Sequence, residues 1–181
     1  MSSLKGQLLI ASSDLFDPNF RRAVVLVTAH SDEGAMGLVL NRPSEATVAE
    51  AVPALAEVVP DDSLVHAGGP VEPGAVVVLA EFEDPGAAAA LVFADVGFMA
   101  ADADTATLPL ETRRTRVFAG YAGWGPGQLE AELEADGWII EPARREDVFF
   151  DVVDDLWSEV LRRKGGPYAL LATMPPDPSM N

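Results

Sequence analysis

The chain has 181 residues, of which 49% are hydrophobic and 23% are charged. This composition suits one folded domain with a sizeable core and excludes a disordered chain. Acidic residues number 29 against 12 basic ones, and the net charge of −17 argues against direct binding to nucleic acid, whose phosphates are held mainly by Lys and Arg. Cysteine is absent, which excludes disulfides, thiolate metal sites and a cysteine nucleophile.

The N-terminal stretch MSSLKGQLLIASSD has one Lys and only a short apolar run. That run is too short for a secretory signal, and no apolar run in the chain approaches the roughly 18 residues that span a bilayer. We therefore expect a cytoplasmic protein that does not enter a membrane.

The first part of the chain predicts strands. Residues 6–12 form a short apolar run that is typical of a strand, and SDLFDPNF at residues 13–20 predicts a turn or a single helical turn. Residues 23–30 and 35–41 are apolar and rich in β-branched residues, which predicts two further strands. The short sequence SDEG between them predicts a hairpin.

After the NRP sequence, the spacing of the apolar residues changes from that of a strand to that of a helix. Thr47 has Glu50 three residues later, which is the spacing of a capping box, so we expect a helix of two to three turns that ends or bends near Pro53. SLVHAGGPV and residues 74–82 then predict strands. The Ala-rich stretch that follows predicts strand, loop and strand, with a helical turn after Asp102.

The last third combines two helices with two strands. TRVFAGYAGW predicts a strand that enters a glycine-rich corner, and GQLEAELEADG predicts an amphipathic helix that ends at Gly137. WIIEPA predicts a strand, REDVFF a turn of helix, and VVDDLWSEVLRRKGG a second amphipathic helix that Gly165 stops. We expect residues 166–181 to be a loosely packed tail that is held only at its start.

Strands outnumber helices in this reading, and many strands are neighbours along the chain. Strict strand–helix–strand alternation is missing. The pattern therefore predicts a single α+β domain over residues 1–181 with a mixed or largely antiparallel sheet, rather than a doubly wound parallel sheet.

The two histidines are His30 and His66, each at the end of an apolar strand. Neither belongs to a metal motif such as H-x-x-H, and the nucleophile elbow G-x-S-x-G is missing, so we expect neither a metal nor a cofactor. A hydrolase or transferase that uses His30 or His66 with nearby carboxylates is the alternative hypothesis. An imidazole bonded to a backbone carbonyl is the commoner arrangement for such a residue.

Arg-Arg pairs occur at residues 21–22, 113–114, 144–145 and 162–163. Scattered pairs do not make the basic stripe that a nucleic acid requires. We expect these arginines to form surface salt bridges with nearby carboxylates.

The glycine-rich stretch GYAGWGPGQLEAEL at residues 120–133 approaches two phosphate motifs without completing either. Pro126 stands where the Walker A loop needs Lys, and Gln128 stands where the dinucleotide fingerprint needs its third glycine. The stretch predicts a strand-to-helix corner. Tyr121 and Trp124 are core anchors of this corner or a stacking surface for a ligand.

The order of motifs along the chain resembles that of the AlgH/YqgE family of bacterial proteins. The motifs are D-P-x-F, N-R-P, G-G-P-V and G-Y-A-G-W-x-x-G-Q-L-E, in blocks that cover nearly the whole chain. The Ala-rich middle, about residues 82–113, matches least well, and the ending LLATMPPDPSMN departs from the proteobacterial pattern. The resemblance implies an α+β domain with a strongly bent, mixed and mainly antiparallel sheet that forms a pseudo-barrel, with helices packed on the outside.

The resemblance implies no established catalytic set or cofactor, and it implies an indirect regulatory role in transcription. As candidates for binding a ligand or partner we take Asn41, Arg42, Gly68, Gly69, Tyr121, Trp124 and Gln128. As structural positions of the motifs we take Asp17, Pro18, Phe20, His30, Pro43, Pro70, Gly120, Gly123, Gly127 and Glu130. The hypothesis is a non-enzymatic cytoplasmic binding protein that acts through a protein partner or a small ligand.

Overall fold

The structure, a computed structural model, describes residues 3–12, 20–100, 112–150 and 155–174. The strands in this part of the chain are β1 (Gln7–Ala11), β2 (Val24–Ser31), β3 (Gly34–Val39), β4 (Pro43–Thr47), β5 (Leu64–Ala67), β6 (Val71–Phe82), β7 (Ala90–Phe93), β8 (Val96–Phe98), β9 (Thr112–Trp124) and β10 (Trp138–Pro142). The helices are α1 (Val48–Ala51), α3 (Gln128–Glu134), α4 (Arg145–Val148), α5 (Leu156–Lys164) and α6 (Pro167–Leu171), with 3-10 turns at Pro53–Leu55 and Pro85–Ala87. The predicted α+β class is confirmed.

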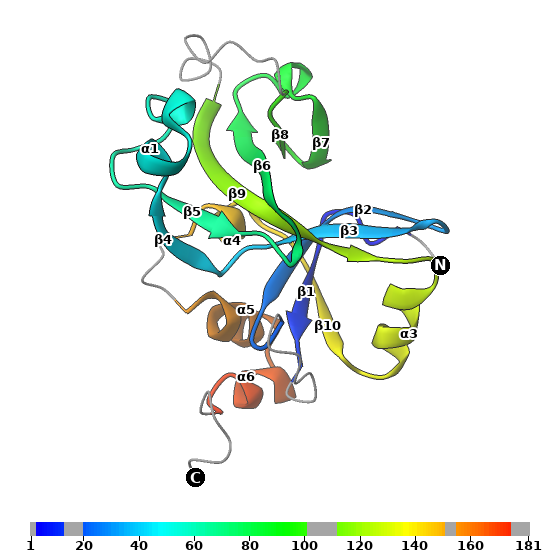
Figure 1. Cartoon of the computed structure of the whole chain (residues 1–181). Helices are drawn as coiled ribbons and strands as arrows, with labels where there is room; N and C mark the ends of the chain where they lie inside the picture. Colours follow the sequence, from blue (N-terminus) through cyan, green and yellow to red (C-terminus); the bar gives the residue numbers. More distant parts are fainter. Residues whose placement is uncertain (1–2, 13–19, 101–111, 151–154, 175–181) are drawn as a thin grey trace.

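One sheet contains all the described strands, and eight of them follow the order β10-β1-β2-β3-β9-β6-β8-β7 (Figure 1). Neighbours along this path are antiparallel. Strand β4 pairs with β5, which in turn runs parallel to β9 at Phe118 and Ala119. The sheet is therefore mixed and mainly antiparallel, as predicted.

The sheet is bent but open. Strands β10 and β7 are the two ends of the path, and no ladder joins them within the described residues. Figure 1 shows the long strands β6 and β9 curving across the molecule, with α5 and α6 beside one end of the sheet and α3 beside another. The implied pseudo-barrel is thus a curved sheet that does not close.

The core lies on both faces of the sheet, which explains the continuous apolar runs in the sequence. Leu8 and Ile10 of β1 belong to the cluster that α5 covers, whereas Leu9 belongs to the cluster that α3 covers with Leu129. Alternate residues of a strand point to opposite faces, so a strand with helices on both sides needs apolar residues at every position. Full burial of each such side chain stabilises the fold by about 1.5–3 kcal/mol.

The segment after NRP differs from the prediction. Strand β4 occupies residues 43–47, and the helix is the single turn α1 instead of two to three turns. The hydroxyl of Thr47 caps this turn, since it accepts a hydrogen bond from the backbone N–H of Glu50 at 3.2 Å and donates to the Glu50 carboxylate at 3.0 Å. Residues 43–47 pair with β5 before the helix starts, and Pro53 begins a separate 3-10 turn after α1.

The start of the C-terminal tail is helical. Helix α6 follows α5 directly, and Ala172 beyond it is buried in the cluster that also contains Val160 and Leu161 of α5. Residues 175–181 and the expected helical turn after Asp102 lie outside the described residues. Among the helices that are described, none is long and apolar enough to cross a membrane.

Candidate functional site

Three motifs meet where β5 leaves β9, and we call this place the glycine crossing (Gly68, Gly69 and Gly120). The backbone N–H of Gly68 donates to the carbonyl of Ala119 at 2.8 Å, and the carbonyl of Gly68 accepts from Val39 at 2.8 Å. A Cβ on Gly68 would lie 2.3 Å from the carbonyl oxygen of Gly120, and a Cβ on Gly69 would lie 2.2 Å from the carbonyl group of Tyr121. The glycines are needed because two backbones touch there.

Asn41 and Arg42 hold the neighbouring chain. The side-chain oxygen of Asn41 accepts from the N–H of Val24 at 2.9 Å, and its amide nitrogen donates to the carbonyl of Arg22 at 2.9 Å. Arg42 donates to the carbonyl of Arg21, and burial lowers the pKa of its guanidinium. Pro43 begins β4, and Asp17 and Pro18 lie outside the described residues. The NRP motif therefore has an internal structural use.

The glycine-rich corner is also held by internal contacts. Trp124 and Trp138 both donate from Nε1 to Oε1 of Glu132, at 3.1 and 2.9 Å. Gln128 accepts from the N–H of Gly125 at 3.0 Å and donates to the second oxygen of Glu132 at 3.1 Å. The ring of Phe20 stacks on Trp124, with centroids 6.3 Å apart. Trp124 is thus an anchor of the corner, and ligand binding by Gln128 or Tyr121 stays a prediction.

Gly127 and Gly120 give the corner its path, since both have positive φ angles, of 76° and 78°. Gly123 pairs with Met36 of β3 in the ladder. Pro70 follows the glycine crossing and precedes β6. In the structure these residues set the path of the backbone.

His30 uses both ring nitrogens within the fold. Its Nδ1 accepts from the backbone N–H of Leu4 at 3.0 Å, so the proton of the neutral ring is on Nε2, which lies 2.6 Å from Oε1 of Glu130. The imidazole side chain is only 4% exposed. The hydrogen bond from His30 lowers the pKa of Glu130. His30 therefore connects the N-terminal segment, β2 and α3.

A cleft of about 860 Å³ runs along the first half of β9, and we call it the β9 cleft. One wall is the segment 57–64, the second is residues 112–117 of β9, and the third is Phe149 and Phe150, with His66 also in the lining. Its volume is within the range of small-molecule sites. His66 is the single candidate from the sequence that lines it.

The sequence does not predict this cleft, because its walls come from three segments that lie far apart along the chain and share no motif. Residues 113–114 are an Arg-Arg pair, residues 115–117 begin a predicted strand, and Phe149 and Phe150 belong to a predicted turn of helix. Strand β9 is open to the cleft here because β6 pairs with one edge along Thr112–Ala119, whereas β5 reaches the other edge only at Phe118 and Ala119.

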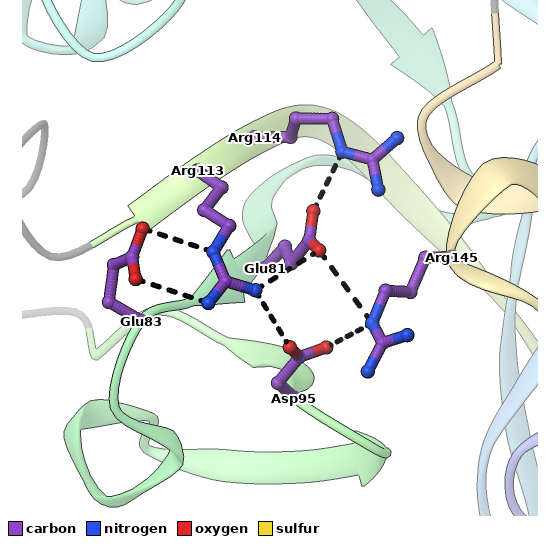
Figure 2. Close-up of polar contacts among 6 residues, drawn as sticks. All are labelled: Glu81, Glu83, Asp95, Arg113, Arg114 and Arg145. Atoms are coloured by element: carbon purple, nitrogen blue, oxygen red, sulfur yellow. Dashed lines mark hydrogen bonds and ion pairs between the residues drawn. The ribbon is translucent and has the colours of Figure 1, made fainter.

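A network of six charged side chains lies beside the cleft (Figure 2). Its centre is Glu81, whose side chain is only 6% exposed and accepts from Nε of Arg114 at 2.7 Å. Nitrogens of Arg113 and Arg145 lie 3.6 Å from the other oxygen of Glu81. A buried carboxylate needs such partners, because an unpaired charge in the interior is costly.

The remaining residues of the network bring the numbers of carboxylates and guanidiniums to equality. Glu83 accepts two hydrogen bonds from Arg113, at 3.0 and 3.1 Å. Asp95 accepts from Arg113 at 3.3 Å and from Arg145 at 2.6 Å, and the bond from Arg145 lowers the pKa of Asp95. Three carboxylates thus face three guanidiniums. Salt bridges predicted for the Arg-Arg pairs are confirmed for these arginines.

Arg113 and Arg114 of the network both line the cleft, and Arg114 is the one with a single hydrogen-bonded carboxylate. Its hydrogen bond to Glu81 uses Nε, and Figure 2 shows no dashed line from its two terminal nitrogens to the carboxylates of the network. The side chain is 40% exposed, and Cζ lies 5.0 Å from the centre of the Phe149 ring. A guanidinium carries five N–H donors in a fixed plane, so Arg114 keeps donors for an anion.

His66 is buried like His30 but has different hydrogen-bond partners. The residue is 1% exposed, and Nδ1 lies 3.2 Å from the carbonyl oxygen of Leu64. Because a carbonyl only accepts, Nδ1 carries the proton and Nε2 is an acceptor, which has no hydrogen-bond partner among the described residues. Burial, with a smaller effect of the nearby Arg116 charge, lowers the pKa of His66 to about 4. At neutral pH the ring is uncharged.

Neither histidine is held as the histidine of a Ser-His-Asp triad is. In that triad a carboxylate binds one ring nitrogen and the other nitrogen faces the nucleophile. His66 is held by a carbonyl, and both nitrogens of His30 have internal partners. Within the described residues, no group of three or more His, Asp or Glu side chains is placed to hold a metal ion.

Comparison with known proteins gives one consistent family. A family model described as AlgH-like matches residues 8–169. A UPF0301 protein of Streptomyces coelicolor is 40% identical over 189 residues, which cover 100% of this chain and 97% of the relative. A UPF0301 protein of Mycobacterium tuberculosis is 41% identical over 186 residues, with 97% of this chain and 90% of the relative covered.

Two solved structures share the fold. A crystal structure of a Corynebacterium diphtheriae protein superposes with a TM-score of 0.89 at 27% identity, over 96% of this chain and 94% of that one. The solution structure of AlgH from Pseudomonas aeruginosa superposes with a TM-score of 0.72 at 29% identity, over 97% of each chain. The curved sheet is therefore common to these proteins.

Proposed function

The chain belongs to the AlgH-like family, and on that premise we propose that it is a non-enzymatic, cytoplasmic regulatory protein that binds a small anionic ligand in the β9 cleft. The observation that carries the proposal is Arg114, whose Nε is held by Glu81 while its terminal nitrogens form no bond to the carboxylates of the network. A cation that is already oriented loses little freedom when an anion binds, which favours affinity.

The cleft has the other features of a small-molecule site. It is large enough for a metabolite, and its lining combines the aromatic rings of Phe149 and Phe150 with many polar and charged side chains. Phe149 lies under the Arg114 guanidinium and offers an apolar surface next to it. These contacts support binding of a molecule with a charged end and an apolar body.

Regulation would then act through a second protein that binds this one. The segment 57–64 forms one wall of the cleft and is tied to β9 where the Thr115 hydroxyl donates to the carbonyl of Val58 at 3.1 Å. A ligand between this segment and β9 would change the surface that a protein partner meets. An effect on transcription would be indirect, because the net charge of −17 opposes contact with DNA.

The test is a thermal-shift screen of anionic metabolites, including nucleotides, followed by calorimetric titration of each hit. We expect at least one hit whose affinity falls by tenfold or more in Arg114→Gln, because the charge-assisted hydrogen bonds are lost. The matched control is Arg162→Gln, which removes an exposed arginine of α5 outside the cleft and should leave the affinity unchanged. A screen without hits, or hits that bind Arg114→Gln as they bind the wild type, would overturn the proposal.

A further inference from the structure

The β9 cleft presents two polar groups that are well separated along one strand. His66 pairs with Phe118 in the parallel ladder between β5 and β9. Arg114 precedes Phe118 on β9, and at roughly 3.3 Å per residue the two positions lie about 13 Å apart. One small functional group cannot contact both side chains, but an elongated molecule can.

Arg114 and His66 require opposite hydrogen-bonding partners. Arg114 only donates, and it donates best to an oxyanion. Nε2 of His66 only accepts, since Nδ1 carries the proton that faces the carbonyl of Leu64. A buried acceptor without a partner is costly, so a ligand that supplies a donor gains more there than at an exposed group.

The path between the two groups is aromatic. The Phe150 ring meets the His66 ring edge-on, with centroids 6.3 Å apart, and Phe118 lies on the buried side at 5.8 Å. Cζ of Arg116 lies 5.1 Å from the Phe150 ring. Nε2 is buried and Phe150 packs against the His66 ring, so contact between a ligand donor and Nε2 requires the Phe150 side chain to move.

The opposite wall limits the charge of the ligand. Glu57, Asp61 and Asp62 belong to the segment 57–64 that lines the cleft. These carboxylates would repel a second anionic group, whereas the arginines attract the first. The cleft therefore favours a molecule with a single anionic end.

We propose that the ligand is an elongated molecule with one oxyanion at Arg114, an aromatic or apolar body against Phe149 and Phe150, and a hydroxyl or amino donor for Nε2 of His66. This inference rests on the proposed function and specifies the ligand of the same cleft. The oxyanion is a phosphate or a carboxylate.

The test uses three related probes in calorimetric titrations: phenyl phosphate, 4-hydroxyphenyl phosphate and 4-hydroxyphenylacetate. The first two differ only in the donor, and the last two carry a phosphate and a carboxylate. We expect the wild type to bind 4-hydroxyphenyl phosphate about tenfold more tightly than phenyl phosphate, since the added donor satisfies a buried acceptor. In His66→Phe this difference should vanish, and in Arg114→Gln both phosphates should bind at least tenfold more weakly.

A measurement on the wild type guards against a variant that fails to fold. Nitrogen-15 NMR of the imidazoles reports two rings, and His30→Gln assigns them. On addition of 4-hydroxyphenyl phosphate, the Nε2 signal of His66 should move as it accepts a hydrogen bond, whereas phenyl phosphate should leave it in place.

The outcomes separate this inference from the proposed function. Equal affinity for the two phosphates, with both dependent on Arg114 and a stationary Nε2 signal, would overturn the donor contact and leave the anion site standing. Absence of Arg114-dependent binding by any probe would contradict the elongated ligand, and the metabolite screen would then decide the proposed function separately.

Discussion

His30 and Glu130 are 100 residues apart in the chain, yet Nε2 of the histidine lies 2.6 Å from the carboxylate. The pair connects β2 to α3, and the second nitrogen of the ring fixes the N-terminal segment through Leu4. Both residues belong to the family motifs, so the motif that reads as a loop signature also contains a tertiary contact. Glu130→Gln should lower the free energy of unfolding, because a neutral amide replaces the charged acceptor.

The pH dependence of Glu130→Gln tests whether the loss of stability is electrostatic. The folded state lowers the pKa of Glu130 below its ordinary 4.5, so its contribution is present above that pH and is lost as the pH falls. Urea unfolding from pH 7 to pH 3 should show the wild type and Glu130→Gln converging in the acid range. A constant difference at every pH would contradict an electrostatic contribution from this pair.

His66 gives a second pH dependence in a different range. Its pKa falls from 6.5 in the unfolded chain to about 4 in the fold, so the unfolded state takes up a proton first as the pH drops. Stability is therefore complete above pH 6.5 and decreases toward pH 4, by up to about 3 kcal/mol. In His66→Phe the slope of unfolding free energy against pH should be smaller in this window. An unchanged slope would show that groups other than His66 cause the loss of stability in this pH range.

The glycine crossing should not tolerate a side chain. Gly69→Ala places a Cβ 2.2 Å from the backbone of Tyr121, and we expect a loss of about 2–4 kcal/mol in unfolding free energy, since backbone cannot move aside cheaply. The control is Gly74→Ala, where a Cβ meets nothing within 4 Å. Equal stability of the two variants in urea unfolding would contradict the close approach.

Glu132 should matter to both tryptophans of the corner. Glu132→Ala removes the acceptor of Trp124 and Trp138, and we expect a loss of about 1–3 kcal/mol from two indole donors without partners. Glu132→Gln keeps one acceptor oxygen and should lose less. Urea unfolding followed by tryptophan fluorescence measures both variants. Wild-type stability in Glu132→Ala would show that water replaces the carboxylate fully.

Much of the fold could be predicted from local patterns. The strands around Leu9, Val25 and Val39 are continuous apolar runs, because both faces of the sheet are covered. Helix α5 ends at Gly165, as predicted, and the structure adds Asp155 as its N-cap. Strand β4 was missed because its sequence PSEAT lacks the apolar alternation of a strand and becomes one by pairing with β5, a contact that no local signal reveals.

The cleft shows the limits of motif reasoning more clearly. The N-R-P and G-G-P-V motifs suggested Asn41 and Gly68 as binding residues. In the structure their contacts join one backbone segment to another. Arg114 and Phe149 carry no motif, and they become neighbours only when α4 packs beside β9. A signal existed in His66, a histidine at a strand end, but its missing hydrogen-bond partner is visible only in three dimensions.

The central claim, an anion site in the β9 cleft, is tested most directly by a titration of the nitrogen-15 labelled protein with phenyl phosphate, followed by backbone amide NMR. We predict that the signals that move belong to residues 112–117 and 57–64, and that they stay still in Arg114→Gln. Movement confined to the corner around Trp124 and Gln128, or identical movement in Arg114→Gln, would contradict it.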